Sequence, residues 1–194
     1  MTVTVVAARL PLAELVELSP DEWLRYDETP SIDALRSPVQ VYYDDVQVGQ
    51  ELPRYIRRRS VVEMQRWSIT MENTHRVHYD YPHATNVDKL PGVLFHGSWR
   101  LSIVAAWLKN WALPDGWLWK YSFQVRAMVV ANETTILWGK VRDKRMVDGL
   151  GLVDVQFGII GESAGEGAPG TATVVLPVRG GRPVPYPFVP PREV

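Results

Sequence analysis

The chain has 194 residues and a formal net charge of −1, with 21 lysine and arginine residues against 22 aspartate and glutamate residues. This balance offers no basic surface for nucleic acid, and the absence of cysteine excludes disulfides, zinc–thiolate sites and cysteine nucleophiles while fitting a cytoplasmic protein. We expect neither a signal peptide nor a membrane span, because the N-terminus lacks the basic-then-apolar pattern and no apolar run approaches about 20 residues.

Both ends of the chain are expected to lie outside the main domain, which we assign to residues 39–179. Within the N-terminal extension, residues 1–38, the run Ser-Pro-Asp-Glu at residues 19–22 predicts a short helix that ends near Arg25. The C-terminal tail, residues 180–194, is rich in proline, which cannot join a central strand or a helix. We expect it to be an extended surface segment or an arm on a partner subunit.

Two strands and a helix are predicted at the start of the domain. The segments Val39–Tyr43 and Glu51–Arg59 have the composition of strands. Ser60 is followed three residues later by Glu63, which is the pattern of a capping box. Apolar residues then recur at helical spacing over Val62–Thr70, so we expect a helix there.

A long central helix and four strands follow. Ser98–Leu113 is apolar on nearly every side, which predicts a helix wrapped by other structure until Pro114 ends it. The next four segments are rich in β-branched and aromatic residues: 119–130, 134–144, 149–160 and 171–178. Gly, Ala and Ser at residues 162–170 indicate a mobile hairpin connection. Together these elements predict an α+β hotdog fold, an antiparallel sheet wrapped around a long helix.

All four histidines lie between Thr74 and Gly97. Histidine is the usual proton carrier in catalysis because its pKa lies near neutral pH. We do not expect a metal site, because His75 and His78 are three positions apart, a spacing that suits two ligands only on a helix. The loop that follows is interrupted by Pro82 and offers no obvious third ligand.

Residues 73–80 (NTHRVHYD), then Ala84 and residues 93–97 (VLFHG), resemble the MaoC-like hydratase/dehydratase family of hotdog proteins. The closest resemblance is to the branch of 3-hydroxyacyl-thioester dehydratases and mesaconyl-CoA hydratases, and residues 121–141 are more weakly similar to a strand pair of the family. The resemblance implies a lyase that reversibly hydrates acyl thioesters. It implies no cofactor besides the coenzyme A or carrier-protein phosphopantetheine of the substrate. It also implies a homodimer or higher oligomer, or a hetero-oligomer with a second hotdog subunit.

The same resemblance implies that His78 is the catalytic acid or base. The alternative is a buried structural histidine held by Asp80 or by a backbone carbonyl. The commoner branch of the family has an aspartate five residues earlier, where this chain has Asn73. An amide can orient water or substrate but cannot take a proton. The adjacent Glu72 is ionisable and is our candidate for the missing carboxylate, with a solvated loop glutamate as the alternative.

Hydration of a 2-enoyl thioester places negative charge on the thioester oxygen in the transition state. Backbone N–H groups at a helix N-terminus stabilise such a charge, and glycine lets a ligand approach the backbone closely. Gly97 and Ser98 open the central helix, so we expect them to form the oxyanion site. The alternative for Gly97 is that it only permits tight packing.

The remaining polar residues have weaker assignments. His75 and Arg76 either hold the loop or contact the substrate, including a phosphate of its carrier. His83 is expected to be peripheral and His96 to have a packing role. The arginine run at residues 57–59 is either a solvated strand end or a site for the phosphates of coenzyme A.

Two other functions remain open from the sequence. The chain could be a non-catalytic hotdog subunit that stabilises an active homologue. It could also be a module that binds an acyl thioester or polyketide in a tryptophan-rich pocket, since eight tryptophans are many for this length.

Overall fold

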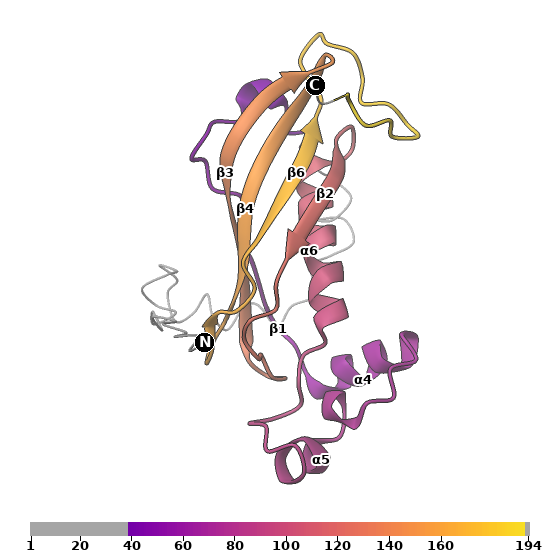
Figure 1. The fold of residues 1–194 in the computed structure, drawn as a ribbon, viewed down its shortest axis with the longest axis vertical. Helices are drawn as coiled ribbons and strands as arrows, with labels where there is room; N and C mark the ends of the chain where they lie inside the picture. Colours follow the sequence, from indigo (N-terminus) through magenta and orange to yellow (C-terminus); the bar gives the residue numbers. More distant parts are fainter. Residues whose placement is uncertain (1–38, 193–194) are drawn as a thin grey trace, which may run out of the picture.

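The computed structural model describes residues 39–192, in which one antiparallel sheet curls along a long helix (Figure 1). The strands are β1 (Tyr55–Arg58), β2 (Trp117–Phe123), β3 (Thr134–Val147), β4 (Leu150–Gly161), β5 (Gly165–Glu166) and β6 (Gly170–Leu176). The helices are α4 (Val61–Thr70), α5 (Tyr81–Asn86) and α6 (Gly97–Ala112), with 3₁₀ turns η2 (Tyr43–Asp45) and η3 (Arg76–His78). The strand order is β1-β3-β4-β6-β2, and β5 pairs with β4. The predicted α+β sheet around a helix is confirmed.

The central helix α6 begins and ends within one residue of its predicted bounds. Its inner face packs on the sheet through Val104, Leu108 and Trp107, whose indole Nε1 donates to the carbonyl of Pro53 at 2.8 Å. Gly139 on β3 permits this approach, because a Cβ there would lie 2.7 Å from the Trp107 ring. Other structure does not cover α6 completely in the described residues, since Leu101 on the outer face is 44% exposed.

The predicted early strands are shorter in the structure. Val39–Tyr43 forms no strand and leads into η2. The segment predicted at Glu51–Arg59 is a regular strand only over β1, because Pro53 has no N–H to donate to a ladder. The segment predicted to reach residue 130 leaves the sheet after Phe123, which pairs with Gly170. The residue before that glycine is Pro169, which has no N–H and cannot donate the next hydrogen bond of the ladder.

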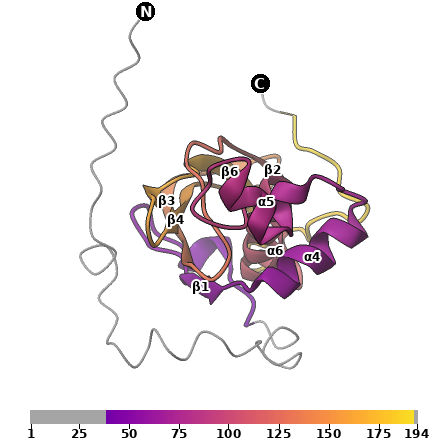
Figure 2. The same cartoon turned by 90° about the horizontal axis from the view of Figure 1, so that it is seen from below.

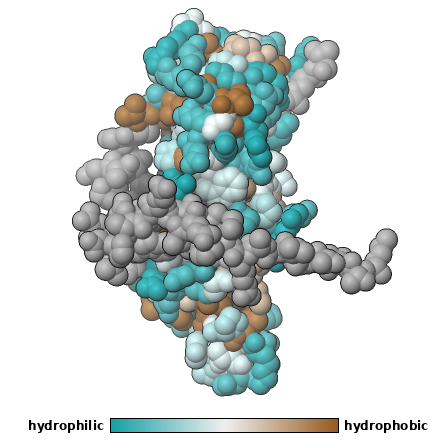
Figure 3. Space-filling view, turned by 90° about the vertical axis from the view of Figure 1, so that its left-hand side faces the viewer, coloured by the Kyte–Doolittle hydropathy of each residue, from teal (hydrophilic) through white to brown (hydrophobic). Residues whose placement is uncertain are grey.

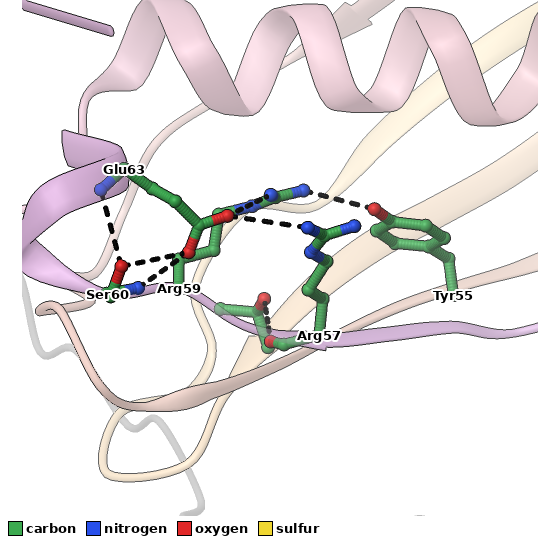
Figure 4. A network of polar contacts seen from close by, with 6 residues as sticks. Tyr55, Arg57, Arg59, Ser60 and Glu63 are labelled. Carbon is green, nitrogen blue, oxygen red and sulfur yellow. Dashed lines mark hydrogen bonds and ion pairs between the residues drawn. The ribbon is translucent and has the colours of Figure 1, made fainter. Parts of the chain in front are cut away.

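The start of α4 is the predicted capping box (Figure 4). Ser60 Oγ accepts the Glu63 N–H at 3.3 Å, and Glu63 Oε2 accepts the Ser60 N–H at 2.8 Å. The other carboxylate oxygen pairs with Arg57 at 3.4 Å and Arg59 at 3.2 Å, and Arg59 also donates to Tyr55 Oη at 3.0 Å. Burial raises the pKa of Glu63, but these hydrogen bonds and charges outweigh it and hold the pKa below its usual value. Arg58 Nε donates to the Asn132 carbonyl at 2.6 Å, so all three arginines of this run make contacts within the fold.

The described part of the proline-rich tail packs on its own sheet. Phe188 stacks on Trp117 with ring centroids 5.5 Å apart and also contacts Trp119. The connection at residues 162–170 contains β5 and is thus partly ordered by pairing. The helix predicted near residues 19–25 lies outside the described residues. On the face seen in Figure 3, apolar side chains form separate patches on a largely hydrophilic surface.

Among residues 39–192, no helix combines the length and the apolar character needed to span a membrane.

Candidate active site

The histidine-bearing loop lies at one end of the molecule, where α4, α5 and the N-terminus of α6 meet (Figure 2). Asp80 organises the loop: its carboxylate accepts the His83 N–H at the start of α5 and binds Arg76 at 2.6 and 2.9 Å. Hydrogen bonds from the His83 backbone and from Arg76 lower the pKa of Asp80. His83 itself pairs with Asp88 at 3.3 Å. Asp80 is therefore engaged away from His78.

His78 ends η3 and is half-buried. Its Nδ1 lies 2.9 Å from the carbonyl oxygen of Leu94, and since a carbonyl can only accept, Nδ1 carries the proton. No group within residues 39–192 hydrogen-bonds to Nε2, so this nitrogen is left as a free acceptor. Burial lowers the pKa of His78, the hydrogen bond to the Leu94 carbonyl opposes this shift, and electrostatic interactions with His75 and Arg100 add to it. His78 is therefore neutral near pH 7, as a general base must be.

His96 is the partner of His78 that the sequence did not reveal. The two imidazoles stack with centroids 3.8 Å apart and planes 20° from parallel. His96 is 1% exposed, and its Nε2 lies 2.9 Å from Ser68 Oγ on α4. Burial lowers the pKa of His96 to about 4. Ser68 and His96 are 28 positions apart, and no local pattern in the sequence links them or signals the stack.

The N-terminus of α6 adjoins this pair, because its N-cap residue is His96 itself. The His96 side chain makes no capping hydrogen bond, and the backbone N–H groups of a first helical turn have no partner within the helix. Gly97 and Ser98 are both exposed. A Cβ at Gly97 would come no nearer than 4.0 Å to another group, Val125 Cγ2. Packing thus does not require glycine here, whereas a ligand approaching these N–H groups would benefit from it.

Asn73 and Glu72 lie apart from His78. They line a groove of about 700 Å³ together with Gln65, Ser68, Ile69, Thr74 and Tyr79. Asn73 accepts the His75 N–H through Oδ1 at 3.1 Å and donates its own N–H to the Ser68 carbonyl at 2.9 Å. Glu72 is exposed and has a φ of 51°. Within the described residues, no hydrogen bond joins His78 to Asn73 or Glu72. The groove is linked to His78 through Ser68, which bonds to His96, whose ring stacks on that of His78.

The other two candidates serve the loop in this structure. His75 Nδ1 accepts the Val77 N–H at 3.4 Å, which caps η3, and the His75 ring lies 6.0 Å from that of His78. Arg76 is held by Asp80, as described above. In the part of the chain that the structure describes, no three His, Asp or Glu side chains come together as metal ligands.

Comparison with known proteins agrees with the fold and the loop. Residues 46–130 match the family model of hydroxyacyl-thioester dehydratase type 2. No curated protein sequence matches the chain.

Three solved structures illustrate the likeness of fold. The R-hydratase PhaJ1 from Pseudomonas aeruginosa has a TM-score of 0.63 at 15% identity, over 80% of this chain and 97% of its own. The MaoC-like dehydratase from Rhodospirillum rubrum has a TM-score of 0.61 at 14% identity, over 72% and 98%. The ChsH1–ChsH2 complex from Mycobacterium tuberculosis has a TM-score of 0.58 at 16% identity, over 67% of this chain and 98% of its own. The chain is thus similar to the dehydratase family over residues 46–130, and it shares the hotdog fold of these solved structures.

Proposed function

We propose that this protein catalyses the reversible addition of water to a 2-enoyl thioester, forming a 3-hydroxyacyl thioester. The acyl carrier is coenzyme A or the phosphopantetheine of a carrier protein. One observation carries the proposal: His78 holds its Nδ1 proton against Leu94 and leaves Nε2 free, beside the uncapped N-terminus of α6. A cytoplasmic location is part of the proposal and is supported by the absence of cysteine.

The proposed chemistry needs one neutral imidazole and one anion site. Nε2 of His78 takes a proton from water as the water oxygen bonds to the β-carbon of the substrate. The electron pair of the double bond moves toward the thioester oxygen, where the N–H groups of Gly97 and Ser98 stabilise the negative charge. The imidazolium of His78 then returns a proton to the α-carbon, so atoms and charge balance. Dehydration follows the same steps in reverse.

The groove residues have supporting roles in this proposal. The Asn73 side-chain N–H₂ is free to orient water or substrate, since the amide oxygen is bonded within the loop. Glu72 is the carboxylate among the residues that line the groove and the candidate for a second acid or base. The hydrogen bonds of His75 and Arg76 support the loop-holding alternative over phosphate contact.

An oligomer is also proposed, as a homodimer or with a related subunit. The end strand β2 and the exposed Leu101 on α6 are free within residues 39–192 to meet another chain. One observation favours the non-catalytic alternative: no carboxylate is among the groups that shift the pKa of His78. No carboxylate of the described residues hydrogen-bonds to His78. One solved neighbour is itself a ChsH1–ChsH2 complex.

Hydration of crotonyl-CoA by the purified chain, followed as loss of the conjugated thioester absorbance, tests the proposal. His78→Ala should lower kcat by about 10²–10⁴-fold, the usual contribution of a general acid or base, while crotonyl-CoA binding persists. His83→Gln is the matched histidine control, and its activity should be unchanged. If turnover requires a co-expressed second hotdog subunit, the chain is the supporting subunit. Tight thioester binding with no turnover under any condition would identify a binding module.

A further inference from the structure

We propose that His96, held by Ser68, is a positioning residue that fixes the ring of His78 for proton transfer. This role rests on the proposed function of His78, but its geometric part can be measured without substrate. His96 itself is not placed in contact with the reacting atoms.

The first support is the geometry of the stack. At 3.8 Å between centroids and 20° between planes, the His96 ring covers one face of the His78 ring. His78 is thus restrained twice, by the Leu94 carbonyl at its Nδ1 and by the stacked ring on its face. A flip of the imidazole about χ2 would place Cδ2 against the Leu94 carbonyl and lose the hydrogen bond. The hydrogen bond therefore fixes which edge of the ring faces Leu94, and the stack fixes the plane of the ring.

The second support is that packing alone does not explain a histidine at position 96. Nε2 of His96 has Ser68 as its partner, but Nδ1 is buried and has no hydrogen-bond partner among the described residues. Buried polar atoms without partners destabilise a fold, and an apolar side chain of similar size would avoid that loss. If Nε2 of His96 carries the proton and donates it to Ser68, the unpartnered atom Nδ1 has a lone pair. A buried acceptor without a partner is tolerated better than a buried N–H without one.

The third support is the charge around the pair. The groups that face His78 are His75 from the loop, Arg100 from α6 and His96 itself, and none of them is a carboxylate. Arg100 is 1% exposed, donates to two backbone carbonyls, and is influenced by Glu133. Because His96 stays neutral until about pH 4, His78 alone carries the proton of the pair.

Ser68 connects the pair to the groove. Its hydroxyl bonds to His96, and its carbonyl accepts the Asn73 N–H at 2.9 Å. Ser68 also lines the groove, although it is only 5% exposed. A single residue of α4 therefore holds both the loop that precedes His78 and the ring that stacks on it.

Imidazole NMR titration tests the proposal directly, because the chain has four histidines and each signal can be assigned by its own substitution. In the unmutated protein we expect His78 to titrate below pH 6.5 as the Nδ1–H tautomer. His96→Ala should raise the pKa of His78 toward its ordinary value and mix the two tautomers, because the ring loses burial and restraint. His96→Phe, which keeps a flat ring in the stack, should preserve both properties more closely. Ser68→Ala should shift them in the direction of His96→Ala.

Kinetics on crotonyl-CoA provide the second readout. His96→Ala should lower kcat by about 10- to 100-fold with little change in KM, as expected when a catalytic group is misplaced by about 1 Å. The acid limb of kcat/KM should move to higher pH with the pKa of His78, and His96→Phe should recover most of the loss. His83→Gln again serves as the control, with the pKa of His78 unchanged.

The outcomes separate the two proposals. If His96→Ala leaves the pKa and tautomer of His78 unchanged, and activity falls only with the folded fraction, His96 is a packing residue and the positioning role is wrong. If the unmutated protein shows no turnover but His96→Ala still changes the pKa and tautomer of His78, the positional coupling stands and the proposed function fails.

Discussion

Gly97→Ala distinguishes the two interpretations of the glycine that opens α6. The added methyl meets no atom nearer than 4.0 Å, and Gly97 is absent from the residues with positive φ, so alanine fits its backbone. Alanine is favoured over glycine in a helix by up to about 1 kcal/mol, less at the first position. We therefore expect the free energy of unfolding to rise by about 0.5 kcal/mol and Tm by about 1–2 °C.

Activity should change in the opposite direction. The methyl would stand where the thioester oxygen must approach the Gly97 N–H, and loss of one oxyanion donor typically lowers kcat by about 10²–10³-fold. Hydration of crotonyl-CoA should show a fall in kcat/KM of about that size. Thermal denaturation of the same samples gives the stability.

Gly139→Ala is the matched control, because there a Cβ would lie 2.7 Å from the Trp107 ring. Overpacking of this kind destabilises by about 1–3 kcal/mol, while kcat/KM of the folded protein should persist. If Gly97→Ala instead destabilises the protein and retains activity, the glycine serves packing. If neither property changes, the oxyanion site is not at Gly97.

Three further predictions concern stability. The pKa of His96 is about 4 in the folded protein and 6.5 for an unperturbed histidine, so the folded protein binds fewer protons than the unfolded chain in this range. The free energy of unfolding should therefore fall by at most about 3 kcal/mol as the pH is lowered from 6.5 to 4. Urea denaturation at pH 7 and pH 4.5 measures this fall, and His96→Phe should make it smaller. Ser60→Ala should destabilise by about 1 kcal/mol in the same assay, through loss of the capping box, and a change near zero would contradict that role. Glu72→Gly should stabilise by about 0.5–1 kcal/mol, because Glu72 has a φ of 51° that glycine adopts without strain; a loss of stability would show that its side chain makes a needed contact.

Local signals in the sequence predicted the elements that position the site. Ser60 and Glu63 specify the start of α4 by hydrogen bonds within four residues, and Pro114 ends α6 because it cannot continue a helix. The long β3 and β4 strands were predicted from their β-branched and aromatic residues, and in the structure they pair with each other through a short turn. Each of these signals acts between residues that are near in the sequence.

Features that depend on distant contacts were missed. Val39–Tyr43 has the composition of a strand, but no strand pairs with it in residues 39–192. Leu101 on the outer face of α6 is exposed in the described chain, because its burial depends on how the sheet curls. The stack of His78 on His96 requires η3 to lie against the start of α6, an arrangement that neither segment encodes alone.

The structure shows how one backbone contact bears on both the structural and the catalytic role that the sequence leaves open for His78. A histidine held by a backbone carbonyl was the alternative to a catalytic one, and His78 is indeed held by the carbonyl of Leu94. Yet a carbonyl accepts one proton from one nitrogen, so the bond fixes the tautomer and leaves Nε2 as a base of defined direction. Burial, together with His75 and Arg100, lowers the pKa of that nitrogen base. In the proposed reaction, the contact that would make His78 structural is thus the contact that prepares it to accept a proton from water.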